Sequence, residues 1–510
     1  MAGENSHCPD MKRHFGPNSP MLGNRRNEDK MNELILDKAN YRDKVFACWL
    51  GKNIGGTLGG PWECKKHTHA LTFYDPIPSK AAPNDDLDLQ LVWLKMLEEM
   101  GLDPSVRTFS EYWSRYACRY PWNEYGFFMR NFDRGLRPPI AGCFENYFVD
   151  EMGSPIRSEI WACMHPGDPQ AAARMAWKDS TLDHAGGEGM YGEMFWAALQ
   201  SAAFVESNPM TLIRIGLNMI PLSSHLARSI REAIWCHQNG KTWGEARERI
   251  ATRFGHIQPC NAVPNHGFTI IGWLYGCDFG DKLCKAVNCG YDTDCTGATL
   301  GALLGILHGT AGIPEKWIAP IGTDIVLHKF TGNCDAPATI GDLTDRTLAL
   351  AEKSLTLKEG ISFGARDVSP EDLRTRRFQN VPGCDAVKQD VHAGVELLRG
   401  KEVWLHYGGE PVLWPGIGKD VEISTVPGPT PAVDLSAPDG WKCDRLGPTR
   451  FRLLAQQAVD GRNVISVAVD GGKVDFVILG PDEAKGYEAG ANVPSCPSCH
   501  ARVEACMCNI

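Results

Sequence analysis

Hydrophobic residues recur at helical spacing through most of the chain, from about residue 41 to about residue 353. In LDLQLVWLKMLEEMG four of the leucines fall on one helical face, and a glycine follows where the helix should end. These positions are Leu87, Leu91, Leu94, Leu97 and Gly101. The segments DPQAAARMAWKD, MYGEMFWAALQSAAFVE and HLARSIREAIWCHQNG have the same character, and strand-like alternation is scarce. The pattern predicts an all-α domain over residues 39–355.

The pattern changes after about residue 390, where hydrophobic and polar residues alternate. In VISVAVDGGKVDFVIL the alternation runs on both sides of Asp470-Gly471-Gly472, a sequence that favours a hairpin turn. The segments EVWLHY and FRLLAQQAV are also strand-like. Together they predict a small C-terminal β-sandwich-like domain over residues 390–482.

Three further segments complete the predicted organisation. Residues 1–38 are polar and rich in Asn, Pro and Arg, which predicts a flexible N-terminal arm. Residues 356–389 contain EGISFGARDVSPEDLRTRRFQNVPG and are expected to form a linker. Residues 483–510 form a Cys-rich tail that ends in CPSCHARVEACMCNI.

Composition narrows the functional class. The 510 residues are 43% hydrophobic and 22% charged, and the formal net charge is −10, which disfavours binding to nucleic acid or to an anionic membrane. No apolar run reaches the roughly 20 residues of a membrane span, and the N-terminus lacks the apolar stretch of a secretory signal. The 19 cysteines are therefore expected to be mostly reduced thiols in a cytoplasmic protein.

The segment NCGYDTDCTGATLGALLGILHG places Asp292 and Asp294 directly before an apolar, glycine-rich helix. Thr296 is the expected N-cap, and the helix is expected over residues 297–308. Glycine recurs at every fourth position of this helix, which predicts that another backbone lies very close to it. The glycines are Gly297, Gly301, Gly305 and Gly309.

The oxygen atoms before this helix suit a hard divalent cation such as Mg²⁺, Mn²⁺ or Ca²⁺. The alternative is that both aspartates only interact with the positive end of the helix. A second acidic helix start, PNDDLDLQ, contains Asn84, Asp85, Asp86 and Asp88. Carboxylates that share a buried site repel one another without a cation, so two such starts favour a metal site between helices. Taken alone, the second motif also fits a solvated helix start.

A third segment, ACWLGKNIGGTLGGPWECKK, is predicted as a helix that runs into a glycine-rich turn ending in Glu63. The turn allows close approach of backbone to a ligand. It lacks the GxxxxGK[ST] pattern of a phosphate loop, and Lys52 precedes the glycines, so phosphate binding is poorly supported.

These three segments, in this order, resemble the ADP-ribosylglycohydrolase family, which includes the enzyme that removes ADP-ribose from dinitrogenase reductase. The G-D-A-L-G-x-P-x-E motif of the family corresponds to GGTLGGPWE at residues 55–63. Its T-D-D-T motif corresponds to NDDL at residues 84–87, and its G-x-D-T-D-T motif to GYDTDC at residues 290–295. The resemblance spans residues 41–350, and the added β domain indicates a divergent branch.

The resemblance implies an all-helical orthogonal bundle that binds two Mg²⁺ ions in a cleft. By motif position, the implied metal ligands are Asn84, Asp85, Asp86, Asp292 and Asp294, with Thr296 as a substitute for the last threonine of the motif. The implied catalytic carboxylates are Glu63, Asp85 and Asp86, any of which could act as the base. The implied substrate-binding residues are Asp183, His184, Gly290 and Tyr291; for Asp183 and His184 the alternative is a helix cap with a satisfied histidine.

The implied activity is cleavage of the glycosidic bond at the anomeric carbon of an ADP-ribosyl conjugate, on a protein or a small molecule, by a metal-positioned water. Three positions depart from the family: Asn84 and Leu87 replace threonines of T-D-D-T, and Cys295 replaces the last threonine of D-T-D-T. The sequence therefore retains the ligands of one metal more fully than those of two. The alternatives are a glycosidase for another ribosyl or furanosyl substrate and a non-catalytic binding or structural relative.

The C-terminal tail offers a separate candidate metal site. Its cysteines have the spacing of zinc ligands, and the alternative is a reduced tail without metal. The residues are Cys496, Cys499, His500, Cys506 and Cys508.

Overall fold

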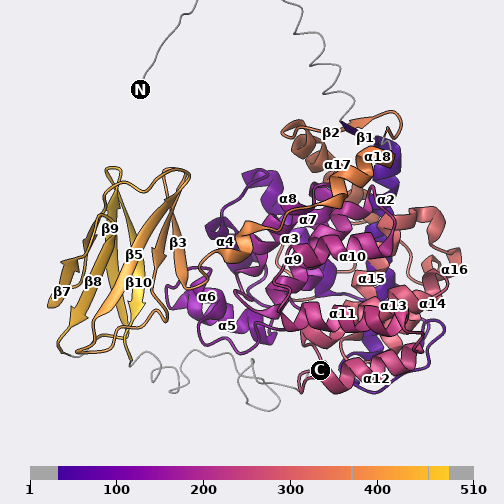
Figure 1. Cartoon of the computed structure of the whole chain (residues 1–510), viewed down its shortest axis with the longest axis horizontal. Coiled ribbons are helices and arrows are strands. Elements are labelled where there is room, and N and C mark those ends of the chain that lie inside the picture. The colour runs from indigo at the N-terminus through magenta and orange to yellow at the C-terminus, as the bar shows by residue number, and fades with distance from the viewer. Residues whose placement is uncertain (1–32, 369–370, 458, 482–510) are drawn as a thin grey trace, which may run out of the picture.

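The computed structural model describes residues 33–368, 371–457 and 459–481. Figure 1 shows a helical body, coloured indigo to orange, and a body of yellow and orange strands beside it. The tail at residues 482–510, with its candidate zinc ligands, lies outside the described residues.

The helical body contains seventeen α-helices within the described residues, which confirms the predicted all-α domain. In chain order they are α2 (Lys38–Gly59), α3 (Asp85–Met100), α4 (Val106–Tyr116), α5 (Asn123–Asp133), α6 (Ile140–Cys143), α7 (Ser158–Met164), α8 (Pro169–Ser180), α9 (Glu188–Ala203), α10 (Pro209–Asn218), α11 (His225–Gln238), α12 (Trp243–Phe254), α13 (Ala262–Tyr275), α14 (Phe279–Asn288), α15 (Thr293–His308), α16 (Glu315–Ile318), α17 (Ile340–Thr356) and α18 (Glu371–Gln379). Short 3₁₀ turns lie at η1 (Gly60–Trp62), η2 (Pro155–Arg157), η3 (Thr310–Gly312) and η4 (Asp385–Lys388).

Helices α2 and α15 pack with their backbones in direct contact. A Cβ atom on Gly51, Gly55 or Gly59 of α2 would overlap backbone atoms of α15, and a Cβ atom on Gly297 or Gly301 would overlap backbone atoms of α2. The close backbone predicted beside the glycines of α15 is thus confirmed. The prediction that a glycine-rich turn begins at Gly55 is wrong. Gly55 and Gly59 instead lie within helix α2, where they allow this backbone contact.

The described end of the predicted arm, residues 33–38, and part of the predicted linker contribute to the fold. Strand β1 (Leu34–Asp37) pairs in parallel with β2 (Ile361–Gly364), and α18 follows within the predicted linker. The reason is a small hydrophobic cluster that the two segments share. Its buried members are Leu34, Leu36, Leu355, Ile361 and Leu373.

The C-terminal region forms two antiparallel sheets, as predicted. One has the order β3-β4-β5-β8-β7 and the other β10-β9-β6. The strands are β3 (Ala393–Leu398), β4 (Lys401–His406), β5 (Lys419–Val426), β6 (Asp434–Ser436), β7 (Trp441–Arg445), β8 (Arg450–Ala455), β9 (Arg462–Val469) and β10 (Gly472–Leu479). Alternate side chains of both sheets, such as Leu405, Leu453 and Ile465, are buried in the hydrophobic core.

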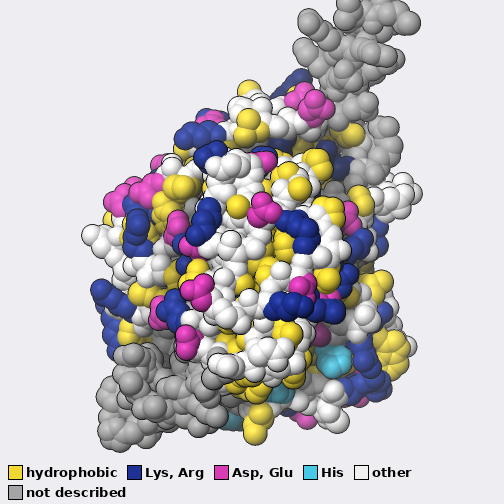
Figure 2. Space-filling view, turned by 90° about the vertical axis from the view of Figure 1, so that its left-hand side faces the viewer, with side chains coloured by type: hydrophobic (Ala, Val, Ile, Leu, Met, Phe, Trp, Pro, Cys, Tyr) yellow, Lys and Arg dark blue, Asp and Glu magenta, His cyan; other side chains and the backbone are white. Residues whose placement is uncertain are grey.

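The predicted hairpin joins β9 to β10 through a two-residue turn. Asp470 and Gly471 have φ angles of 51° and 67°, the positive values of the turn that matches strand twist. On the face that Figure 2 shows, basic and acidic side chains are interspersed. Acidic and basic side chains of this domain form ion pairs, such as that of Asp420 with Arg452 at 2.6 Å.

Among the described residues, none of the helices combines the length and the apolar character needed to cross a membrane.

Candidate functional site

The two acidic helix starts meet in the structure. One carboxylate oxygen of Asp86 on α3, one of Asp294 on α15 and the sulfur of Cys295 all lie within 4.8 Å of one another. Asp86 has no exposed surface, and Asp294 is also buried. Residues 208 positions apart in the chain are thus brought together at the N-terminal ends of two helices.

Glu63 joins this cluster from the segment after α2. One of its carboxylate oxygens lies within 4.8 Å of oxygens of Asp292 and Asp294. Its side chain is exposed, whereas both aspartates are buried, so Glu63 lies at the solvent side of the cluster. We call Glu63, Asp85, Asp86, Asp292 and Asp294 the acidic cluster.

Backbone hydrogen bonds hold the Glu63 segment against the loop before α15. The amide of Cys64 donates to the carbonyl of Tyr291 at 2.8 Å, and the amide of Tyr291 donates to the carbonyl of Lys65 at 3.0 Å. Gly290 has a φ of 77°, and a Cβ atom there would overlap the carbonyl oxygen of His67. Gly290 and Tyr291, predicted to bind substrate, therefore fix the position of Glu63 in this structure.

Helix α15 begins earlier than predicted. Asp292 is its N-cap residue, and the helix starts at Thr293 rather than after Thr296. The backbone N–H of Asp292 donates to Oδ1 of Asn265 at 3.2 Å, and the amide of Asn265 donates to the carbonyl of Asn261 at 2.9 Å. Asn265 of α13 thus holds the backbone at the start of α15. The side chain of Asp292 makes no capping hydrogen bond.

Thr296 lies within the first turn of α15 and is fully buried. Its hydroxyl donates to the carbonyl of Thr293 at 3.2 Å. Its role as a metal ligand stays a prediction.

The buried carboxylate oxygens of the acidic cluster fit a hard cation. Among the described residues, both oxygens of Asp86 and the Oδ1 atoms of Asp292 and Asp294 have no hydrogen-bond partner. A buried polar atom without a partner is costly, and carboxylate oxygens are the preferred ligands of Mg²⁺, Mn²⁺ and Ca²⁺. Cys295 adds a soft sulfur atom that suits none of these ions well.

Mutual repulsion and burial raise the pKa values of the cluster. Burial, followed by the charge of Asp294, raises the pKa of Asp85 to about 7. The nearby charge of Asp294, followed by burial, raises the pKa of Glu63 well above its usual value. Burial is the main cause of the raised pKa of Asp292. Asp85 can therefore exchange a proton close to neutral pH, and Glu63 is a stronger base than an ordinary glutamate.

A buried lysine, which sequence reasoning did not identify as part of the site, provides a fixed positive charge. The Nζ atom of Lys52 lies 3.0 Å from Glu159 and 3.7 Å from Asp86, and all three side chains are fully buried. Burial disfavours the ammonium form, but the charges of Glu159 and Asp86 outweigh it and raise the pKa of Lys52. No local pattern distinguishes Lys52 from any other helical lysine, so only the contact reveals it.

The remaining polar residues of PNDDLDLQ have separate partners. Asn84 caps α3 by accepting from the amide of Asp86 at 2.8 Å. Asp88 accepts from the amide of His328 at 2.6 Å and from the hydroxyl of Thr331 at 2.7 Å. Asp88 therefore anchors the loop that contains His328, whereas Asn84 remains beside the acidic cluster.

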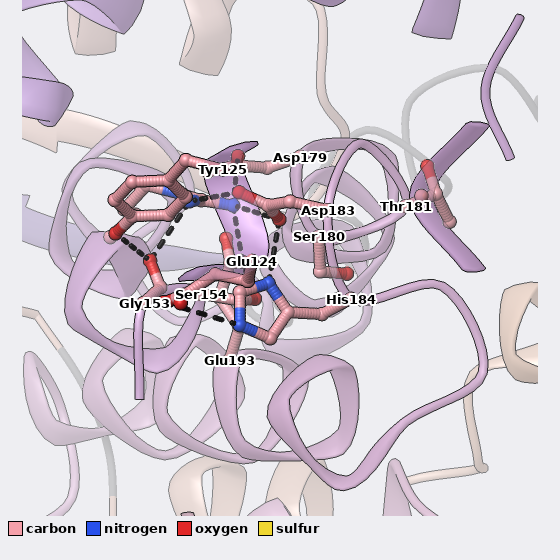
Figure 3. A network of polar contacts seen from close by, with 12 residues as sticks. Glu124, Tyr125, Gly153, Ser154, Asp179, Ser180, Thr181, Asp183, His184 and Glu193 are labelled. Atoms are coloured by element: carbon pink, nitrogen blue, oxygen red, sulfur yellow. Dashed lines mark hydrogen bonds and ion pairs between the residues drawn. The ribbon is translucent and has the colours of Figure 1, made fainter. Parts of the chain in front are cut away.

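Asp183 and His184 lie in a buried network of ion pairs that Figure 3 shows. The Arg157 guanidinium donates to both oxygens of Asp183, at 2.8 and 3.0 Å. Nδ1 of His184 lies 2.6 Å from Asp183, and its Nε2 lies 3.9 Å from Glu124. Burial alone would raise the pKa of Asp183, but Arg157 and His184 lower it to about 2.

The network approaches the acidic cluster through Glu124. Burial, with smaller effects from the charges of Asp183 and Asp85, raises the pKa of Glu124 to about 8. Asp183 and His184 have no exposed surface, so their contact with substrate stays a prediction.

Trp122 is a half-buried aromatic residue beside the acidic cluster. Its indole acts to lower the pKa of Asp85 slightly, against the larger effect of burial, and its ring lies 6.3 Å from that of His328. An aromatic ring beside charged oxygens suits a sugar or a base. Tyr125, the neighbouring aromatic candidate, is core instead, with 1% of its surface exposed.

Comparison with known proteins identifies the family of the chain. The sequence profile of the family described as ADP-ribosylglycohydrolase matches residues 37–362, which is more than half of the chain. A solved structure titled "ADP-ribosylglycohydrolase-related protein complex" is 18% identical, with a TM-score of 0.44 over 62% of this chain and 99% of the other. No curated protein sequence matches significantly. The family match covers helices α2 to α17 and all three motifs, so the chain belongs to the ADP-ribosylglycohydrolase family.

Proposed function

We propose that the chain is a metal-dependent glycohydrolase that cleaves the glycosidic bond at the anomeric carbon of an ADP-ribosyl conjugate, on a protein or a small molecule. The observation that carries the proposal is the convergence of Asp86, Asp292 and Asp294, whose buried carboxylate oxygens include atoms without hydrogen-bond partners, with Glu63 on the solvent side. Family membership supports the glycohydrolase class. The free cysteines of the described residues support the cytoplasmic location expected from the sequence.

Asp86, Asp292 and Asp294 would hold the cation, together with Asp85 and the side-chain oxygens of Asn84 and Thr296. A bound Mg²⁺ would supply positive charge that orients the ribose hydroxyls and makes a water molecule more acidic. Mn²⁺ or Ca²⁺ would suit the same oxygen atoms. The number of ions, one or two, depends on how Cys295 is accommodated.

Carboxylates of the acidic cluster would accept the proton of the attacking water and stabilise the positive charge at the anomeric carbon. Glu63 or Asp85 would accept the proton of the attacking water, and the raised pKa of each makes its carboxylate a stronger base. The carboxylates also lower the energy of the positive charge that develops at the anomeric carbon. Glu63 is the more accessible of the two and is our preferred base.

Asp183 and His184 would support the site from the protein interior. The ion pair of Arg157 with Asp183 fixes His184, which in turn lies against Glu124. Gly290 and Tyr291 would shape the floor on which the ribose lies, because they connect the Glu63 segment to α15.

A second candidate is a glycosidase for another ribosyl or furanosyl substrate. Cys295 lies in the position of a family hydroxyl with its sulfur beside Asp86 and Asp294, and this changes the ligand set. A non-catalytic binding protein is disfavoured, since unpaired buried carboxylates only destabilise a fold that has no use for them.

The test is hydrolysis by the purified protein with Mg²⁺. The substrates are ADP-ribosyl-arginine, an ADP-ribosyl-serine peptide and a panel of furanosides, and the products are followed by chromatography. Release of ADP-ribose from one conjugate, lost in Asp294→Asn and retained in Asp88→Asn, supports the proposal. Release of a simple sugar alone supports the second candidate, and no release with no cation binding supports the non-catalytic alternative.

A further inference from the structure

Two thiols and a carboxylate converge at the edge of the acidic cluster. One oxygen of Glu63, the sulfur of Cys64 and the sulfur of Cys260 all lie within 4.8 Å of one another. The two sulfur atoms are thus close together, although 196 positions separate Cys64 and Cys260 in the chain. Both cysteines are partly exposed, and neither is in a disulfide.

The two sulfur atoms are held in place by separate backbone contacts. Cys64 has a φ of 63°, and its amide donates to the carbonyl of Tyr291 at 2.8 Å. The carbonyl of Cys260 accepts from the amide of Met152 at 2.9 Å. The ammonium group of Lys66 donates to the carbonyl of His256 at 2.9 Å, which joins the two segments. The convergence therefore does not depend on the thiols themselves.

The ligand chemistry differs from that of the acidic cluster. Two thiolates and one carboxylate form a set that Zn²⁺ binds well, with Zn–S distances of about 2.3 Å and a fourth position left to water. Mg²⁺ and Ca²⁺ prefer oxygen atoms and gain little from sulfur. The two groups nevertheless share Glu63, which faces Asp292 and Asp294 on one side and the thiols on the other.

We propose that Glu63, Cys64 and Cys260 form a binding site for a thiophilic divalent cation such as Zn²⁺, and that its occupation inhibits the enzyme. Binding replaces the thiol protons, which pass to solvent, and involves no redox step. Zn²⁺ draws the carboxylate of Glu63 away from the acidic cluster, so the preferred base is lost. The inhibitory part rests on the proposed function, whereas the binding part does not.

Binding is tested with Co²⁺ as a spectroscopic probe, because thiolate ligands produce a charge-transfer absorption with Co²⁺ that oxygen ligands do not. The full-length protein is used with Cys295 and the tail cysteines Cys496, Cys499, Cys506 and Cys508 replaced by Ser, so that neither the acidic cluster nor the tail contributes a thiolate. The band should form in this background, disappear in both Cys64→Ser and Cys260→Ser, and persist in the control Cys443→Ser. Zn²⁺ should displace Co²⁺ with the same dependence on the variants, and each Ser variant should weaken Zn²⁺ binding by at least about tenfold.

A band that persists in both Ser variants overturns the site, and so does a band that is present only when the tail cysteines are intact. Inhibition is tested separately, by adding Zn²⁺ to the enzyme saturated with Mg²⁺. Inhibition should be at least about tenfold weaker in Cys64→Ser, and equal inhibition in both proteins overturns the regulatory part. If the protein hydrolyses none of the substrates, the proposed function fails, while the Co²⁺ band still decides whether the site exists.

Discussion

A Cβ atom on Gly55 would overlap the carbonyl oxygen of Gly297. The backbones of α2 and α15 therefore touch directly above the acidic cluster. Helix α2 leads into Glu63, and α15 begins with Asp292 and Asp294, so one helix contact fixes two parts of the site. The glycines are required here by the distance between two backbones rather than by local flexibility.

Replacing Gly55 with Ala should destabilise the helical domain, because the added methyl group must push α2 away from α15. Overpacking of this kind costs about 1–3 kcal/mol, and a backbone clash lies at the upper end. The measurement is the free energy of unfolding from a denaturant titration. The matched control is Gly244→Ala in α12, where a Cβ atom meets nothing within 4 Å and Ala should slightly stabilise the helix. Equal effects of the two substitutions would show that α2 and α15 are not in backbone contact.

Replacing Asp292 with Asn should stabilise the cation-free protein and remove its response to Mg²⁺. The carboxylate of Asp292 is buried beside Asp294 and Glu63, and Asn relieves their repulsion while keeping the shape. A cation at a hundredfold its dissociation constant stabilises a protein by about 2.7 kcal/mol. Thermal unfolding with and without Mg²⁺ measures both effects.

Asp88→Asn is the control for this prediction, because Asp88 lies in the same acidic helix start but is bonded to the loop of His328. It should unfold at lower temperature and still respond to Mg²⁺. A full Mg²⁺ response in Asp292→Asn would exclude Asp292 as a ligand.

Replacing Glu63 with Gln should lower kcat for the hydrolysed substrate by about 10²–10⁴-fold, the usual contribution of a positioned acid or base. The KM should change much less, because the amide keeps the size of the side chain. Steady-state kinetics at saturating Mg²⁺ give both parameters. Asp75→Asn, which alters an exposed carboxylate later in the same segment, should leave both unchanged. A change confined to KM would assign Glu63 to binding instead.

Replacing Glu124 with Gln should change how stability depends on pH. The pKa of Glu124 is raised from its ordinary 4.5 to about 8, so the folded protein holds this proton through a range in which the unfolded chain releases it. The group therefore reduces stability as the pH rises from about 5 to about 8, by about 1.4 kcal/mol per pH unit. Glu124→Gln is neutral throughout and lacks this loss, so the variant should gain stability over the wild type as the pH rises. Parallel pH profiles of the two proteins would mean that Glu124 is ionised in the folded state.

Local patterns in the sequence determined the family and many of the helices and strands. Leucine spacing fixes α3, alternation around Asp470 and Gly471 fixes the β9–β10 hairpin, and three motifs in order identify the ADP-ribosylglycohydrolase family. These features depend on neighbouring residues, so the sequence alone contains them. The every-fourth-residue glycines of α15 also predicted a close backbone, although they could not say which one.

Tertiary packing decided which of the candidate residues meet. Only the fold shows that the first glycines after Lys52 extend α2 and that Lys52 neutralises Glu159 and Asp86. It also turned Asp183 inward to Arg157 and placed Cys260 beside Cys64. The physical reason is that each of these contacts joins segments distant in sequence, and their energies depend on burial and on distances that arise only when the helices pack.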